Sequence, residues 1–183
     1  MIRTGLHLRP VFALFLAFGV LLGASAPASA QGALKEKIGD WQLRCDKVAD
    51  RPEEQCILMQ SLVDDQSTVD GQKAEINLVV VVLKATDPKA GNARKPILRV
   101  IAPLGILLPR GLGLKIDSVV IGATGFVRCL ANGCVAEVEL DDGLIDKMKK
   151  GKEALFVIFL PPDEGRGLPL NLDGFEKGFS QLQ

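Results

Sequence analysis

The sequence has no tyrosine and only one histidine, His7. If the N-terminal segment that contains His7 is cleaved off, no imidazole remains. Serine–histidine–aspartate triads, imidazole general bases and histidine-containing zinc sites are then excluded. Lysine plus arginine and aspartate plus glutamate number 22 each, so the bulk positive charge that favours nucleic-acid binding is also absent. We therefore expect no nucleic-acid partner.

Long hydrophobic segments are scarce, and the one at the N-terminus is too short for a membrane span. Residues 11–22 form a twelve-residue apolar segment, whereas a spanning helix needs about 20 residues. Two arginines precede it, and Ala28-Ser29-Ala30 follows as an A-x-A cleavage motif. We interpret residues 1–30 as a secretory signal peptide, cleaved between Ala30 and Gln31.

The remainder, residues 31–183, has the length of one domain and contains no second long apolar segment. Short segments with alternating or continuous apolar residues, separated by glycine and proline, are typical of strands. Strands are predicted at residues 41–45, 56–62, 78–83, 97–101, 106–108, 112–116, 126–130, 133–140 and 154–160. This pattern predicts an all-β fold, an antiparallel β-sandwich of immunoglobulin-like appearance, without a membrane span in the mature chain.

Two short helices interrupt the strand pattern, and the second is C-terminal. Residues 142–150 place three apolar residues on one face, and Gly151 then ends the helix as a C′ residue. Near the C-terminus, Asp173 and Glu176 have the spacing of a capping box. The apolar residues of this tail recur at helical spacing, at Leu172, Phe175, Phe179 and Leu182.

Four cysteines in an exported chain of this size indicate two disulfides, for which sequence alone allows three connectivities. The cysteines are Cys45, Cys56, Cys129 and Cys134. The predicted hairpin around Asn132-Gly133 brings Cys129 next to Cys134, and a first hairpin would bring Cys45 next to Cys56. We predict this local pairing, which makes residues 31–183 a single disulfide-linked domain.

Two other uses of the cysteines are less consistent with the sequence. A dithiol redox site uses C-x-x-C at a helix N-terminus, whereas Cys129 and Cys134 are separated by four residues in a predicted strand hairpin. A four-thiolate zinc site is disfavoured by export to an oxidising compartment and by spacings of ten and four residues.

Two segments are candidate interaction surfaces. The only basic cluster consists of Lys147, Lys149, Lys150 and Lys152. Positive charge is favourable at a helix C-terminus, which is sufficient to explain why the lysines are there. The cluster could also contact an anionic cell surface. The apolar loop of residues 102–109 includes Leu104 and Ile106. An apolar loop of this kind is more often buried in the core. Any exposed part of it would be a surface for binding a partner.

Other motifs do not support catalytic or ligand sites. Gly111-Leu112-Gly113 lacks the third glycine of a dinucleotide loop, and Asp64-Asp65 with Asp70-Gly71 lacks the calcium-loop spacing. The carboxylate pairs Glu53-Glu54 and Asp141-Asp142 lie in connections, with nothing to oppose them across a cleft. We predict no catalytic residue, no metal site and no cofactor.

Several motifs together resemble the invasion-associated locus B family of exported bacterial proteins. They are Gly39-Asp40-Trp41 followed by Cys45 and Cys56, Leu108-Pro109-x-Gly111-Leu112-x-Leu114-x-Ile116-Asp117, Phe126-x-Arg128-Cys129-x₄-Cys134, and Leu170-x-Leu172-x-Gly174-Phe175. The resemblance covers essentially all of residues 31–183. It implies a periplasmic or surface-associated β-sandwich of Gram-negative bacteria, without known catalytic residues or cofactor. The family's name comes from a role in host-cell invasion by a pathogen, which the resemblance does not extend to this chain.

We therefore expect a non-enzymatic protein exported to the periplasm, the outer-membrane surface or the medium. Its partner would be an unknown protein or another component of the cell envelope or host surface. The alternative is an envelope hydrolase or a thiol-redox enzyme. A deep pocket with converging carboxylates would favour that alternative.

Overall fold

The structure is a computed structural model that describes residues 32–48, 54–65, 68–69, 72–73, 75–84 and 95–182. The predicted signal peptide, the cleavage site between Ala30 and Gln31, and Asp70-Gly71 lie outside these residues, so those predictions are not tested. Within them the chain forms two antiparallel β-sheets with two short α-helices, which confirms the predicted fold class.

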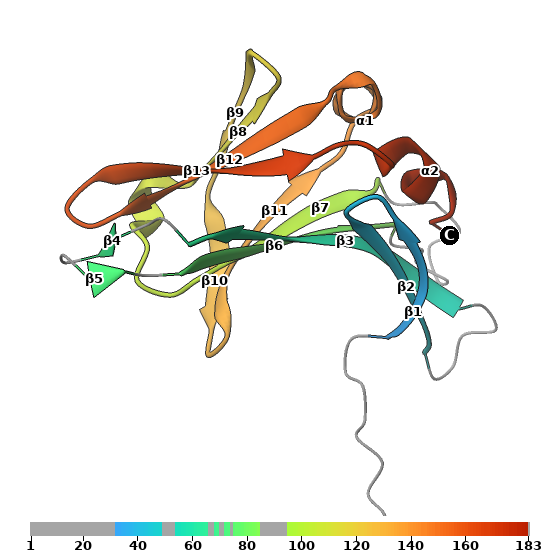
Figure 1. The fold of residues 1–183 in the computed structure, drawn as a ribbon, viewed down its shortest axis with the longest axis horizontal. Helices are drawn as coiled ribbons and strands as arrows, with labels where there is room; N and C mark the ends of the chain where they lie inside the picture. The colour runs from blue at the N-terminus through green and yellow to red at the C-terminus, as the bar shows by residue number, and fades with distance from the viewer. Residues whose placement is uncertain are drawn as a thin grey trace, which may run out of the picture. The chain divides into compact units, whose positions relative to one another are not determined.

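The larger sheet has seven strands in the order β1-β2-β3-β6-β7-β11-β10 (Figure 1). Its strands are β1 (Ala33–Ile38), β2 (Trp41–Lys47), β3 (Glu54–Asp64), β6 (Ile76–Leu83), β7 (Ile97–Ala102), β10 (Phe126–Leu130) and β11 (Gly133–Glu139). Alternation of apolar and polar residues in β2, β3 and β7 buries one face of each strand, as the period of two predicts.

The smaller sheet has four strands in the order β13-β12-β8-β9, and β13 contacts β3 of the larger sheet (Figure 1). Its strands are β8 (Leu112–Ile116), β9 (Val119–Thr124), β12 (Glu153–Leu160) and β13 (Glu164–Asn171). The other elements are a two-strand ribbon of β4 (Thr68–Val69) and β5 (Gln72–Lys73), the 3₁₀ helix η1 (Leu108–Arg110), α1 (Asp142–Lys150) and α2 (Phe175–Ser180).

The inner faces of both sheets and the apolar faces of the helices contribute to one hydrophobic core. Trp41, Phe156 and Phe175 are its largest side chains and are fully buried. Phe175 lies with its ring centroid 5.5 Å from that of Trp41. At the surface above them, Asn171 donates an Nδ2 hydrogen bond to Asp40 Oδ2 at 2.8 Å. The segment with Asp40 and Trp41 and the C-terminal segment with Asn171 and Phe175 therefore contact each other both in the core and at the surface.

The cysteines pair locally, as expected from the hairpins. Cys45 is bonded to Cys56 and Cys129 to Cys134, with Cα atoms 4.1 and 3.9 Å apart. Each pair is directly opposite across neighbouring strands. Each disulfide therefore cross-links one hairpin, and no cysteine is free.

The prediction of a strand at residues 106–108 is wrong. This segment leads into η1, and the Leu107 N–H donates to the Phe159 carbonyl at 2.8 Å. The Ile106 side chain is only 8 % exposed and belongs to the core. At Ile106 the apolar residue therefore reflects burial in the core and not pairing in a sheet.

The predicted helix at residues 142–150 is confirmed, and the Asp141 carboxylate caps it by accepting from the Leu144 N–H at 2.7 Å. As predicted, the helix ends at Gly151, which has an extended backbone with φ −72°. Glycine suits the position because a Cβ would lie 2.8 Å from Ile116 Cγ2.

The predicted capping box at Asp173 is also wrong. The N-cap of α2 is Gly174, with φ +87° and no side-chain cap. A Cβ at Gly174 would approach the Ile38 carbonyl oxygen to 2.7 Å. The close contact between α2 and the end of β1 therefore requires glycine at this cap.

One ion pair joins β1 to α2 and gives a pH-dependent prediction. Lys177 Nζ lies 2.6 Å from Glu36 Oε1, and Gln181 Nε2 donates to Glu36 Oε2 at 2.9 Å. The Lys177 hydrogen bond, followed by that from Gln181, lowers the pKa of Glu36 below its ordinary 4.5. The stabilisation is therefore present above pH 4.5 and is lost as the pH falls through the lowered pKa.

In a carboxyl NMR titration, Lys177→Met should move the pKa of Glu36 upward towards its ordinary value. Lys35→Met is the control, because Lys35 pairs with Glu54 instead. An unchanged Glu36 pKa in Lys177→Met would show that this ion pair does not persist in solution.

Candidate functional site

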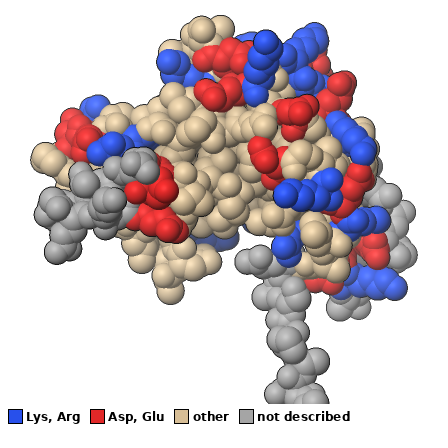
Figure 2. All heavy atoms as spheres, in the orientation of Figure 1, with Lys and Arg blue, Asp and Glu red and all other residues tan. Residues whose placement is uncertain are grey.

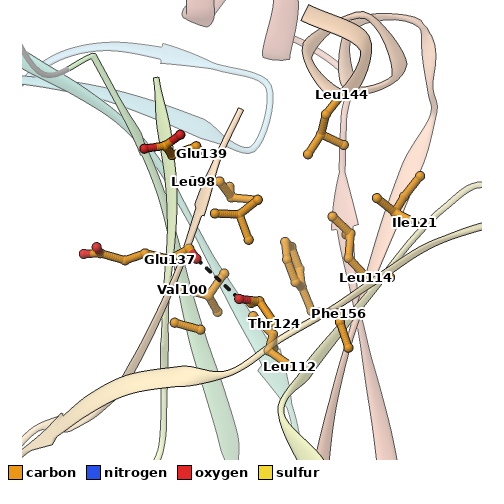
Figure 3. A pocket seen from close by; sticks show the side chains of 14 residues that line it. Leu98, Val100, Leu112, Leu114, Ile121, Thr124, Glu137, Glu139, Leu144 and Phe156 are labelled. Atoms are coloured by element: carbon orange, nitrogen blue, oxygen red, sulfur yellow. Dashed lines mark hydrogen bonds between the residues drawn. The ribbon is translucent and has the colours of Figure 1, made fainter. Parts of the chain in front are cut away.

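A cavity of about 400 Å³ lies between the two sheets (Figure 3). The inner faces of β7, β8 and β12 form its walls, together with residues 121–124 of β9, residues 136–139 of β11 and one residue of α1. The large apolar lining residues are Leu98, Val100, Leu112, Leu114, Ile121, Val138, Leu144 and Phe156. The volume is within the range of small-molecule binding sites, roughly 300–1,000 Å³.

The cavity exists because small residues line it where larger ones would fill the core. Gly122 and Ala123 on β9 and Ala136 on β11 provide little side-chain volume. At one end, the Thr124 hydroxyl donates to the Glu137 carbonyl at 3.5 Å and links β9 to β11. Glu139 and Leu144 lie at the opposite end (Figure 3). The Thr124–Glu137 hydrogen bond therefore closes one end of the cavity, and β11 and α1 border the other end.

The two carboxylates near the cavity do not converge in it. Glu137 and Glu139 lie on β11 at alternate positions, and their side chains point away from the apolar lining residues (Figure 3). Glu137 Oε1 instead pairs with Arg99 Nε at 2.7 Å on the same sheet. Among the described lining residues, Thr124 is the other one with a polar side chain. This arrangement can hold an apolar group and provides no paired acid and base.

The four lysines of the predicted basic surface do not share one face. Lys147 and Lys150 line a groove with Ile116 and Val119. Lys149 Nζ instead lies 5.6 Å from the centroid of the Phe179 ring, and Lys152 borders hollows beside β13. Figure 2 shows lysines and arginines interspersed with acidic residues. On the face shown, basic side chains do not form a continuous patch.

Only some of the apolar residues in the loop of residues 102–109 are exposed. Leu104 is 56 % exposed, whereas Ile106 is buried, so a shared surface for these two residues is wrong. Sequence reasoning missed the larger set of exposed apolar residues on β9 and β10: Val119, Val120, Val127 and Leu130. The uncharged sequence of residues 118–127 was the available signal.

Both disulfides lie within strand hairpins, away from the helix N-termini that lower a thiol pKa. In the described part of the chain, no three histidine, cysteine, aspartate or glutamate residues gather as metal ligands would. Among the helices that the structure describes, none is long and apolar enough to cross a membrane.

The other singled-out motifs have structural roles. Gly111, from the glycine-rich turn, has φ +68°, and a Cβ there would lie 2.7 Å from the Thr124 carbonyl oxygen. Asp141 caps α1, and Glu54 pairs with Lys35 at 3.2 Å. None of these residues lines the cavity.

Comparison with known proteins gives three consistent matches. The family model described as Invasion associated locus B (IalB) protein matches residues 41–183. An Invasion protein B homolog of Brucella abortus (strain 2308) is 26 % identical over 161 residues, covering 87 % of this chain and 84 % of the homolog. A homolog from Brucella abortus biovar 1 (strain 9-941) matches to the same extent.

A solved structure is also similar. The crystal structure of invasion associated protein B from Bartonella henselae superposes with a TM-score of 0.62 at 20 % sequence identity. The match covers 81 % of this chain and 94 % of that chain. At 20 % identity this structural similarity supports the fold alone. The relationship to the family rests on the match to the family model.

Proposed function

The chain belongs to the invasion associated locus B family, and from this premise we propose that it is an exported envelope or surface protein that acts by binding. The observation that carries the proposal is the apolar cavity between the sheets, with its carboxylates directed outward. The partner is an apolar group on a component of the bacterial envelope or of a host surface.

Export is supported by the signal-peptide pattern and by the two disulfides, which are typical of oxidising compartments. The intact mass of protein recovered from the producing bacterium tests this part. A chain beginning at Gln31 would support it, and a chain that retains residues 11–22 would contradict it.

Burial of apolar surface supplies the binding energy, at about 25 cal/mol per Å². An engineered apolar cavity of about 150 Å³ is large enough to bind benzene, so the present cavity of about 400 Å³ accommodates a larger group. Lys147 and Lys150, in the groove next to Val119, are the two lysines placed to contact the same partner outside the cavity.

Filling the cavity tests the proposal. Ala136 is buried and lines the cavity, whereas Ala154 is equally buried and does not. Ala136→Leu should therefore leave the free energy of unfolding within about 1 kcal/mol of the wild type, while Ala154→Leu should lower it by about 1–3 kcal/mol through overpacking. Denaturant unfolding of the three proteins measures this difference.

The same variants test binding with the neutral fluorescent probe N-phenyl-1-naphthylamine. The wild type should bind it saturably, and Ala136→Leu should weaken that affinity about tenfold or more, equivalent to about 1.4 kcal/mol. Ala154→Leu, measured where it is folded, should retain wild-type affinity. Equal probe affinity in the wild type and Ala136→Leu would overturn the cavity as the binding site.

A hydrolase or thiol-redox enzyme of the envelope is the alternative that these residues support less well. Turnover of an envelope substrate by the purified protein, abolished by changing one carboxylate such as Glu139→Gln, would refute the binding-only function. We expect no such turnover.

A further inference from the structure

We propose that the occupant of the cavity is an extended peptide segment of a partner protein, which pairs with β9 as a fifth strand of the smaller sheet. Alternate apolar side chains of that segment then enter the cavity. This inference rests on the proposed function and specifies the kind of partner.

The first observation is that β9 is an edge strand. It pairs with β8 on one side and ends the strand order of the smaller sheet. In an antiparallel pair, alternate residues direct their N–H and C=O groups away from the partner strand. The outer edge of β9 is therefore a row of main-chain donors and acceptors without a strand partner among the described residues.

The second observation is that β9 lacks the features that normally protect an edge. Its residues, VVIGAT, include no charged residue and no proline, although lysine and proline are common protection for edge strands. One edge of the larger sheet, β10, differs because it carries Arg128 and is cross-linked through Cys129, and the other edge, β1, carries lysine and glutamate residues. Val120 on β9 is 70 % exposed.

The third observation is that the cavity runs along β9. Residues 121–124, four in succession, line it, and β7 and β11 line the opposite wall. The pairing of β9 with β8 changes register between Gly122 and Val120, leaving Ile121 as the extra residue of a bulge that borders the cavity. The cavity thus lies beside the strand edge, where inward side chains of an added strand would pack.

Together these features match recognition by strand addition, in which main-chain hydrogen bonds provide affinity and pockets for alternate side chains provide specificity. The absence of charge on β9 and of charged side chains inside the cavity selects an uncharged, alternately apolar segment. A lipid acyl chain could also fill the cavity, but it would leave the main-chain groups of β9 unpaired. The peptide is therefore the occupant that satisfies both features.

The test uses the purified full chain and the synthetic peptide acetyl-Thr-Val-Thr-Val-Thr-Val-Thr-amide. The peptide should displace N-phenyl-1-naphthylamine, and hydrogen exchange followed by NMR should show that alternate amides of residues 119–124 become protected about tenfold or more. Ala136→Leu should weaken peptide binding about tenfold, because the inward valines lose their space.

Two N-methylated forms of the peptide are the matched controls, one methylated on the valine nitrogens and the other on the interior threonine nitrogens. Each blocks one edge of the peptide strand. One form should bind within about twofold of the parent, and the other should lose about tenfold or more, the equivalent of one to three net hydrogen bonds.

The outcomes separate this inference from the proposed function. Displacement of the probe by dodecanol but not by the peptide would overturn strand addition and leave an apolar binding protein. Displacement by the peptide without protection of the β9 amides would also overturn it. If the probe itself does not bind, the proposed function fails as well.

Discussion

Phe175→Ala should lower the free energy of unfolding by about 3–5 kcal/mol, the usual cost of removing a fully buried aromatic side chain. Phe175 is inaccessible to solvent, and its ring centroid lies 5.5 Å from those of both Trp41 and Phe179. Removing the ring leaves a void where α2 covers the larger sheet. Denaturant unfolding, monitored by Trp41 fluorescence and by circular dichroism, measures the loss.

Phe159→Ala is the matched control for this substitution. Phe159 is only partly buried on β12, and its ring contacts Arg110 at 4.5 Å from the centroid. Its replacement should cost about 1–2 kcal/mol, because less apolar surface is lost from the interior. Equal costs at the two positions would show that α2 is not an integral part of the core.

Removing the Cys45–Cys56 disulfide by replacing both residues with alanine should cost about 3 kcal/mol, and removing Cys129–Cys134 in the same way about 2 kcal/mol. The difference follows from loop length, because the paired cysteines are 11 and 5 residues apart. The longer loop loses more conformational freedom in the unfolded chain when it is closed. Unfolding curves recorded without reductant measure both costs.

Reduction of the wild type provides an independent control, since dithiothreitol should reproduce the combined loss of about 5 kcal/mol. Non-reducing peptide mapping should find the same two pairs. A crossed pair, such as Cys45 with Cys129, would contradict the strand arrangement. A larger cost for Cys129–Cys134 than for Cys45–Cys56 would show that loop entropy does not dominate.

Sequence patterns were sufficient for the strands that are buried on at least one face. β2 alternates in burial, and β6 and β12 contain continuous apolar segments, so their local pattern reflects their final environment. The helix at residues 142–150 was equally well determined by its apolar face. The local disulfide pairing followed from the turn between the two strands that it joins.

The strands that the sequence did not indicate lie at sheet edges. β1, β9 and β13 each have one strand neighbour, and most of their residues are exposed, charged or glycine. Their buried residues are Ile38 in β1 and Leu168 and Leu170 in β13, too few for a clear strand pattern. Their strand conformation is imposed by pairing with a central strand, which is a tertiary effect.

The cavity was unpredictable for a related reason. Its walls combine Leu98 on β7, Leu114 on β8 and Phe156 on β12, which are far apart in the sequence and belong to two sheets. Each appears in the sequence as an ordinary core residue. Whether facing core positions meet or leave a space depends on how the two sheets pack against each other around these residues (Figure 3), and no local pattern encodes that spacing.

The most direct test of binding between the sheets is methyl NMR of the wild-type protein titrated with N-phenyl-1-naphthylamine. Binding in the cavity should produce saturable shifts in the methyl groups of Leu98, Val100, Leu112 and Leu114, while the methyl groups of Val63, exposed on β3, remain unchanged. Shifts confined to surface methyl groups, with those four residues unaffected at saturation, would contradict the claim that the protein binds its partner in the inter-sheet cavity.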